Sequence, residues 1–271
     1  MSIFHRFFRR AASDGKSAWV FVLPSLFLLA LLGIPILALA VKAIGPNFLD
    51  FALSSTALSA LRLSLVTSTL STVLSTAAGI PLAYVLARWK FSGKTAVELL
   101  IDLPVVLPPS VAGLALLLAF GRTGMFGKWL SLAGISLPFT TAAVILAQAF
   151  VSAPLFIRSA RIGFGEVDIQ LEEAATVEGA NEWQVFSHVI FPLAGRSILT
   201  GIILAWTRAL GEFGATILFA GNLEGKTQTM PMAIYLGFER NLGIAVALSV
   251  MLVLVSVILL GVMRRLERKE R

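Results

Sequence analysis

The sequence predicts an all-α membrane protein with six transmembrane helices and with both termini in the cytoplasm. Of its 271 residues, 57% are hydrophobic and only 14% are charged, which is not the balance of a soluble domain that covers its surface with polar groups. Six apolar runs are long enough to cross ~30 Å of hydrocarbon as helices. Most of the basic residues also gather at alternate ends of these runs, as expected for short cytoplasmic loops.

The six apolar runs are the predicted spans, and the first of them could be mistaken for a cleaved signal. The spans cover about Ala18 to Val41, Ala57 to Ala87, Leu99 to Phe120, Thr140 to Ile157, Ile198 to Ala220 and Leu242 to Met263. The first run contains Ala38-Leu39-Ala40, which looks like a signal-peptidase site. Because the run is longer than the roughly 7 to 15 apolar residues of a signal peptide, we expect a retained helix.

The distribution of basic residues predicts the orientation. Fifteen of the 22 Lys and Arg residues lie at one set of ends: Arg6, Arg9, Arg10, Lys16, Arg88, Lys90, Lys94, Arg158, Arg161, Arg196, Arg264, Arg265, Arg268, Lys269 and Arg271. Because cytoplasmic loops retain Lys and Arg, these ends are predicted to be cytoplasmic. Attraction to anionic lipid headgroups explains the net charge of +7 better than nucleic-acid binding does.

The residue inventory predicts neither an enzyme nor a metal protein. There is no Cys, and the two histidines, His5 and His188, lie outside the predicted spans, so no nucleophile or metal cluster can be assembled. Gly221, Gly225, Lys226 and Thr227 imitate a phosphate-binding P-loop. The spacing is one residue short and the segment follows a membrane helix rather than a strand, so we expect no ATP hydrolysis by this chain.

The longest non-apolar stretch, Arg158 to Arg196, predicts a cytoplasmic helix, a tight turn and a second helix. From Gly165, apolar side chains recur at three-to-four spacing, at Val167, Leu171, Ala174 and Ala175, and acids lie toward the start. Gly179 is expected to end the first helix, and Asn181 with Gln184 forms a capping box for the second. Such an element suits the docking of a partner; a loop helix packed on its own subunit is the alternative.

The same segment resembles the EAA loop of ABC importer permeases. Its Glu173-Ala174-Ala175, three residues, Gly179, nine residues, Val189, one residue and Phe191-Pro192 match that pattern, with Val189 for Ile and Phe191 for Leu. The resemblance implies a type I ABC importer permease fold. It also implies that residues 165–192 form a coupling loop within a single permease domain of residues 1–271, and that Glu173, Ala174, Ala175 and Gly179 transmit ATP-driven closure of a nucleotide-binding subunit.

Polar groups inside the predicted spans are the candidates for a translocation path. Arg208 and Glu212 share one helical face at i and i+4, either as a structural ion pair or as part of a path or gate, because an isolated charge in hydrocarbon costs at least ~2.5 to 3.5 kcal/mol. Ser64 and Ser68, followed by Ser71, Ser75 and Gly79, face either a polar passage or a neighbouring helix.

Glycine and proline predict special backbone in two of the spans. Gly211 and Gly214 flank the acid of the fifth span, and they imply close packing or a hinge. Pro104, Pro108 and Pro109 leave backbone carbonyls unpaired in the third span, which is tolerated in a bilayer only against protein or water. We therefore expect the third span to be interior.

A wider resemblance points to the substrate. GIPLAYVLAR, DLPVVLPPSVAGLALLLAFG and LGEFGATILFAGNLEGKTQTMPMAIY are similar to the oxyanion branch of these permeases, and the last is closest to molybdate permeases. The resemblance implies a permease subunit of a molybdate or tungstate importer. A sulfate or thiosulfate permease is the alternative within the family, and an ion-gradient-driven secondary transporter is the alternative from another class.

The resemblance also implies a set of partners. These are a second permease subunit, most simply an identical one, two cytoplasmic ATPase subunits that use the ATP, and an extracytoplasmic oxyanion-binding protein. The binding protein is expected to face the loop that contains Lys226, Thr227, Gln228 and Thr229. No cofactor, metal or catalytic residue is expected in this chain, which is placed in a bacterial or archaeal plasma membrane.

Overall fold

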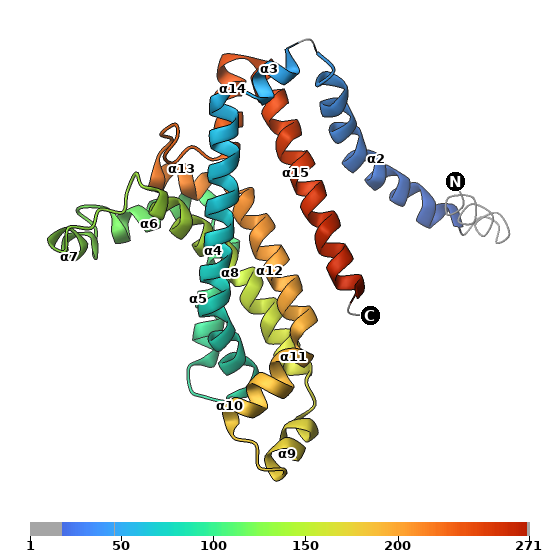
Figure 1. The fold of residues 1–271 in the computed structure, drawn as a ribbon, viewed down its shortest axis with the longest axis vertical. Helices are drawn as coiled ribbons and strands as arrows, with labels where there is room; N and C mark the ends of the chain where they lie inside the picture. Colours follow the sequence, from blue (N-terminus) through green and yellow to red (C-terminus); the bar gives the residue numbers. More distant parts are fainter. Residues whose placement is uncertain (1–17, 46, 270–271) are drawn as a thin grey trace.

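The predicted all-α class is confirmed by the computed structural model, which describes residues 18–45 and 47–269 and contains no strand in those ranges (Figure 1). Its helices are α2 (Ala18–Lys42), α3 (Phe48–Ala52), α4 (Ser55–Arg88), α5 (Lys94–Val106), α6 (Pro109–Phe120), α7 (Gly127–Leu132), α8 (Thr141–Glu166), α9 (Ile169–Val177), α10 (Glu182–Val185), the π-helix η2 (Phe186–Ile190), α11 (Phe191–Leu193), α12 (Gly195–Leu210), α13 (Gly214–Ala220), α14 (Met230–Arg240) and α15 (Leu242–Lys269). His5 and the basic residues before Ala18 that entered the orientation argument lie outside the described residues, as does Arg271.

The described residues provide up to six membrane spans. The helices of α2, α4, α8 and α15 are each long and apolar enough to cross a bilayer. Two bent pairs complete the set if each counts as one span: α5 with α6, and the α10–α11 segment with α12. The cytoplasmic position of both termini stays a prediction.

Two predicted spans are wrong in their details, because each is broken in the structure. The third, expected as one apolar run from Leu99 to Phe120, bends by 118° between α5 and α6, where Pro108 removes a backbone donor. The fifth, expected from Ile198 to Ala220, stops at Leu210, and α13 starts as a separate helix at Gly214. Within this chain the third span is partly interior: Ala112, Gly113 and Leu116 are buried, whereas Pro108 and Pro109 are exposed.

The core forms where α4, α8 and α12 pack together, side by side along most of their length (Figure 1). Small residues let the helices approach closely: a Cβ added at Gly79 of α4 would lie 2.6 Å from the ring of Phe156 on α8. At the end of the bundle near α9, a cluster that includes Leu86, Phe156 and Phe164 is fully buried. Since lipid supplies no hydrophobic driving force between helices, close packing of this kind is what holds membrane helices together.

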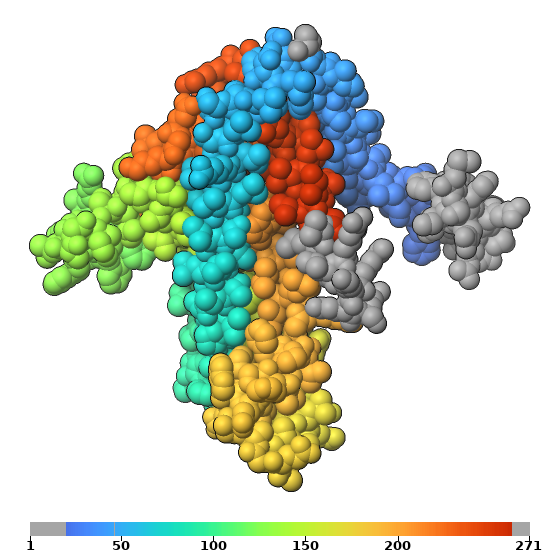
Figure 2. Space-filling view, viewed as in Figure 1, coloured from blue at the N-terminus to red at the C-terminus, as the bar shows by residue number. Residues whose placement is uncertain are grey.

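Two parts of the chain project from this bundle on opposite sides (Figures 1 and 2). One is α2, where Val22 is the single buried residue among the side chains described from Val20 onward. The other is the α6–α7 segment. The remaining apolar side chains of α2, more than half exposed at Phe27 and Leu37 for example, require an apolar medium, as the membrane assignment predicts.

The two ends of the bundle carry different elements. The end of α4, the start of α5 and the end of α8 lie with α9 and α10 at one end, and α3 and α14 lie at the other (Figure 1). The predicted cytoplasmic cations Arg88, Arg158 and Arg161 belong to the α9 end, because α4 and α8 terminate there. The charge pattern and the helix arrangement therefore agree with each other.

Candidate functional site

The predicted helix–turn–helix exists, but its first helix starts later than expected. Gly165 and Glu166 continue α8, and the backbone becomes extended at Val167. Asp168 then caps α9, its carboxylate accepting a hydrogen bond from the amide of Gln170 at 3.0 Å. An acid at this position satisfies an amide that has no helical partner and suits the helix dipole.

The predicted turn and second cap are both confirmed. Gly179 has φ +92°, a left-handed conformation that glycine adopts without steric cost, and the Ala180 amide turns back to the carbonyl of Ala175 at 3.0 Å. Asn181 and Gln184 form the capping box, with amide-to-side-chain distances of 2.8 and 2.9 Å. The sequence thus fixes a stiff bend between α9 and α10.

The residues of the EAA motif are divided between two faces of α9. Glu173, Ala174 and Gly179 are exposed, whereas Ala175 is half-buried and packs against the core cluster near α9. No residue of α9 is buried. Apolar side chains are exposed beside the motif, among them Ile169, Leu171, Val177 and Trp183. The surface that α9 and α10 present is therefore open and carries exposed apolar side chains among acids such as Glu173 and Glu182, a combination that suits a docking surface.

A residue that the sequence argument did not single out ties α9 to the bundle. Arg88, at the end of α4, forms an ion pair with Glu172 and donates a hydrogen bond to the carbonyl of Val167 at 2.9 Å. In the sequence argument Arg88 served only as evidence of orientation. Its position at the end of a long apolar run was a signal that the sequence offered. Nothing in the sequence indicated that Glu172 would be its partner.

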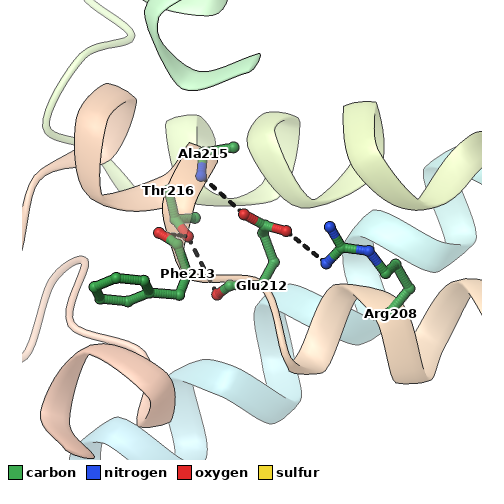
Figure 3. Close-up of polar contacts among 5 residues, drawn as sticks. All are labelled: Arg208, Glu212, Phe213, Ala215 and Thr216. Atoms are coloured by element: carbon green, nitrogen blue, oxygen red, sulfur yellow. Dashed lines mark hydrogen bonds and ion pairs between the residues drawn. The ribbon is translucent and has the colours of Figure 1, made fainter. Parts of the chain in front are cut away.

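The second candidate site lies at the break between α12 and α13 (Figure 3). The guanidinium of Arg208 contacts one carboxylate oxygen of Glu212 at 2.6 Å, and the other oxygen accepts the amide of Ala215 at 2.8 Å. The backbone carbonyl of Glu212 accepts the hydroxyl of Thr216 at 3.2 Å. Glu212 is 1% exposed and the Arg208 side chain is 34% exposed.

This geometry explains why an acid is found at a helix break. The amides in the first turn of α13 have no helical partner, and the Glu212 carboxylate supplies one while Arg208 balances its charge. The pair thus satisfies the buried Ala215 amide and leaves the Arg208 side chain one third exposed. Arg208 ends an exposed face of α12 on which Thr200 and Leu204 precede it at four-residue spacing.

Removing Arg208 alone is expected to destabilise the protein more than changing both partners. Arg208→Leu leaves a carboxylate in a site that is 1% exposed, and breaking a fully buried pair costs about 3–5 kcal/mol; the cost here is lower because the guanidinium is one third exposed. Arg208→Leu with Glu212→Gln keeps an acceptor for Ala215 without the charge. Thermal unfolding of the purified variants measures the difference, and a double variant no more stable than Arg208→Leu contradicts the assignment.

The helices on the far sides of the two breaks are locked together. A Cβ added at Gly113 of α6 would lie 2.7 Å from the Ala215 carbonyl oxygen of α13, and one added at Gly214 would lie 2.6 Å from Cβ of Pro109. Backbone contact on this scale leaves no room for side chains. The expectation of close packing at Gly214 is thus met, and α6 and α13 form one unit beyond the two breaks.

The predicted path residues on α4 are not open to any passage within this chain. Ser64 and Ser68 are both fully buried. The Ser64 hydroxyl accepts the amide of Met230 at 2.7 Å, at the start of α14, and the Ser68 hydroxyl donates to the carbonyl of Leu65 in its own helix. These contacts favour the alternative of helix packing for the serine face of α4.

Most of the side chains predicted to face a binding protein are buried. Lys226 is exposed, but Thr227, Gln228 and Thr229 are buried. The Thr227 hydroxyl accepts the amide of Leu223 at 2.9 Å, which closes the loop on itself. The side chains of this loop that reach the surface are therefore those at Leu223, Glu224 and Lys226.

The described residues contain no cluster of three or more His, Asp or Glu that could hold a metal ion.

Comparison with known proteins assigns residues 75–271 to a family described as "Binding-protein-dependent transport system inner membrane component". The matched region contains the α9–α10 element, both helix breaks and the 221–229 loop.

Individual relatives cover most of the chain. The molybdenum transport system permease protein ModB of Mycobacterium tuberculosis is 42% identical over 90% of this chain and 92% of its own length. ModB of Escherichia coli is 38% identical over 78% of this chain and 94% of its own. A probable sulfate transport system permease protein of Chlorokybus atmophyticus is 36% identical over 82% of this chain and 79% of its own length.

Solved structures share the fold at lower sequence identity. A bacterial ABC transporter that imports the acidic polysaccharide alginate superimposes with a TM-score of 0.80 at 18% identity, over 97% of this chain and 99% of its own. The alginate transporter in complex with its pentasaccharide-bound periplasmic protein gives 0.77 at 18% identity, over 93% of both chains. The predicted importer-permease fold is thereby confirmed.

Proposed function

The chain belongs to the binding-protein-dependent transport system inner membrane component family. Within this family, we propose that it carries an oxyanion across the membrane, and that the oxyanion is molybdate or tungstate. It is a multi-pass membrane protein and the permease subunit of an ABC importer. The substrate rests on relatives named as molybdenum permeases, which are 42% identical over 90% of the chain. The alternative of a gradient-driven secondary transporter is incompatible with this family.

The observation that carries the proposal for coupling is the exposed α9–α10 element. Glu173, Ala174 and Gly179 stand on an open surface beside exposed apolar side chains, and the stiff turn at Gly179 presents them in one geometry. In this proposal an ATPase subunit docks here and hydrolyses the ATP, since this chain offers no phosphate-binding loop. Two such chains, two ATPase subunits and a binding protein make up the transporter.

The proposed path follows the exposed face of α12 to Arg208. A bare guanidinium would hold a dianion strongly, whereas one already paired with a buried carboxylate presents N–H donors with little net charge. An ion must bind well enough to enter a path and weakly enough to leave it, and the Arg208–Glu212 pair, at 2.6 Å, suits that compromise. Arg208 still has donors that Glu212 does not use.

Reconstitution tests the proposed substrate. The permease is assembled in vesicles with its ATPase and binding protein, and ATP hydrolysis and anion uptake are measured with the binding protein loaded with molybdate, tungstate or sulfate. We expect molybdate and tungstate to stimulate both activities and sulfate to stimulate neither.

Stimulation by sulfate alone would overturn the molybdate assignment and favour the sulfate alternative, which the relative from Chlorokybus atmophyticus represents. Uptake that needs no ATPase but collapses with the proton gradient would overturn the coupling proposal itself.

A further inference from the structure

The coupling helix α9 is weakly attached to its own subunit. It has nine residues, none of them buried, and its main packing is against the α10–η2 segment that follows it. Ala175 is the residue of the EAA motif that reaches the core. A helix seated this lightly needs a further tie if a force applied to it is to move the spans rather than the helix alone.

Arg88 provides such a tie, and it joins three helices at one point. It is the last residue of α4, its side chain is 13% exposed, and it donates to the carbonyl of Val167, directly after α8, at 2.9 Å. The same guanidinium pairs with Glu172 of α9. Both contacts are made by the same terminal nitrogen, Nη2, so the Val167 carbonyl and the Glu172 carboxylate meet at one atom of Arg88.

The base from which Arg88 extends is rigid. One turn earlier on α4, the ring of Tyr84 packs edge-on against Phe164 of α8, with centroids 5.8 Å apart, and against Phe186 of η2 at 5.0 Å. These contacts fix the end of α4 against α8 and against the segment that follows α9. The position of the guanidinium is therefore set by the bundle, and the guanidinium adds a tie to α9 beyond the packing of that helix against α10 and η2.

The two neighbouring acids of α9 differ in exposure and in partner. Glu173 is exposed, while Glu172 turns inward, with a side chain 21% exposed, and meets Arg88. One face of the helix is thus free for a partner while the other is fastened to the spans.

We propose that Arg88 is a positioning residue for energy transfer: through Glu172 and the Val167 carbonyl, it makes movement of α9 move α4 and α8 as well. This proposal rests on the proposed function, because it presumes that an ATPase displaces α9. It assigns a role in coupling to a residue outside the EAA motif. Arg88 touches neither substrate nor nucleotide in this scheme.

The chain offers matched controls for the Arg88 pair. Arg161 pairs with Glu98 at 3.0 Å and Arg158 pairs with Asp102 at 2.7 Å. Both pairs lie toward the α9 end of the bundle, and both join α5 to α8 rather than to α9. Arg161→Gln therefore removes an ion pair of similar kind without touching the coupling helix.

The test compares Arg88→Gln, Arg88→Lys, Glu172→Gln and Arg161→Gln in the complete transporter reconstituted in vesicles. The readouts are anion taken up per ATP hydrolysed, ATPase subunit retained on purification, and melting temperature. We expect Arg88→Gln and Glu172→Gln each to lower uptake per ATP by a factor of about 2 to 30, the range for residues that couple distant sites. Arg88→Lys should fall between them and the unmodified protein, because the ammonium keeps the charge and the donors but not the reach of the guanidinium.

A merely structural role for Arg88 would lower the melting temperature and the yield but leave uptake per ATP unchanged in the complexes that survive. That result, or an equal loss in Arg161→Gln, overturns the proposal. If Arg88→Gln does not fold, Glu172→Gln decides, since it changes a side chain near the surface. Absence of ATP-dependent uptake in the unmodified transporter would instead refute the proposed function, so the two failures are distinguishable.

Discussion

Replacing Gly179 by valine will abolish anion uptake while the protein still inserts into the membrane. Gly179 has φ +92°, a region in which an L residue pays about 1–2 kcal/mol and a β-branched one the most. The space around its missing side chain is open, so no clash within the chain unfolds the bundle. The strain instead reorients α9 against α10, and the new side chain projects from the docking surface.

The measurement is uptake in vesicles, alongside the amount of permease in the membrane and the ATPase subunit that copurifies with it. Gly179→Asn is a graded comparison, because Asn tolerates the left-handed region and should keep more activity. Gly165→Val is the matched control, since Gly165 lies on α8 with open space and no positive φ. Undiminished uptake by Gly179→Val would refute the role of this turn.

Replacing Gly113 by leucine will lower both stability and transport. A Cβ at this position would approach the Ala215 carbonyl oxygen to 2.7 Å and its Cα to 2.9 Å. Added methylenes in a tight core cost about 1–3 kcal/mol, and the cost is at the upper end here because backbone, not a side chain, is in the way. Separation of α6 from α13 should also disturb the Glu212 contact to Ala215.

Melting temperature and uptake are measured on the same preparation. Gly33→Leu serves as the control, because Gly33 lies in the exposed helix α2 with no atom within 4 Å of the added Cβ. A Gly113→Leu protein that melts and transports like the unmodified one would show that α6 and α13 do not pack as described.

Spans that are single straight helices were predictable from composition. For α4, the expected Ala57 to Ala87 differs from the observed Ser55–Arg88 by three residues in total. The agreement is close because the polar residues that bound the apolar run, Ser54 and Arg88, also bound the helix. Hydropathy does not show, however, whether the helix axis changes direction within an apolar run. The segments after Pro108 and after Gly211 are as apolar as those before them, so the breaks could be read only from the proline and the glycines.

The faces of α9 could not be predicted from its pattern. Of the four apolar positions expected on one face, Val167 is buried and Ala175 is half-buried, whereas Leu171 and Ala174 are exposed; Glu172 pairs with Arg88 of the bundle. A docking helix directs apolar side chains to a partner chain. The pattern of apolar residues in one chain therefore does not show whether a face packs on the chain's own bundle or on a partner. The local signals, Gly179 and the capping box, were read correctly because they depend only on neighbouring residues.

The Arg88–Glu172 pair and the burial of Ser64 both depend on contacts between distant parts of the chain. The Ser64 hydroxyl accepts a hydrogen bond from the amide of Met230. The sequence near either residue does not predict that the two are in contact. A serine face along a membrane helix predicts packing and passage equally well, and only the position of α14 decides between them. The Arg208–Glu212 pair was predictable at i and i+4, but its service as a cap for α13 followed only from the break.

The length of α4 determines how far the docking element stands from the lipid. Its 34 residues extend about 51 Å at 1.5 Å per residue, whereas the hydrocarbon layer is only ~30 Å thick. Roughly 20 Å of α4, counted over its two ends, is therefore in excess of the apolar layer. The helix ends at Arg88, and this end of the bundle is the one that carries α9 (Figure 1). An ATPase subunit of the proposed transporter would therefore meet α9 outside the apolar layer, at the end of the helix that α9 is tied to.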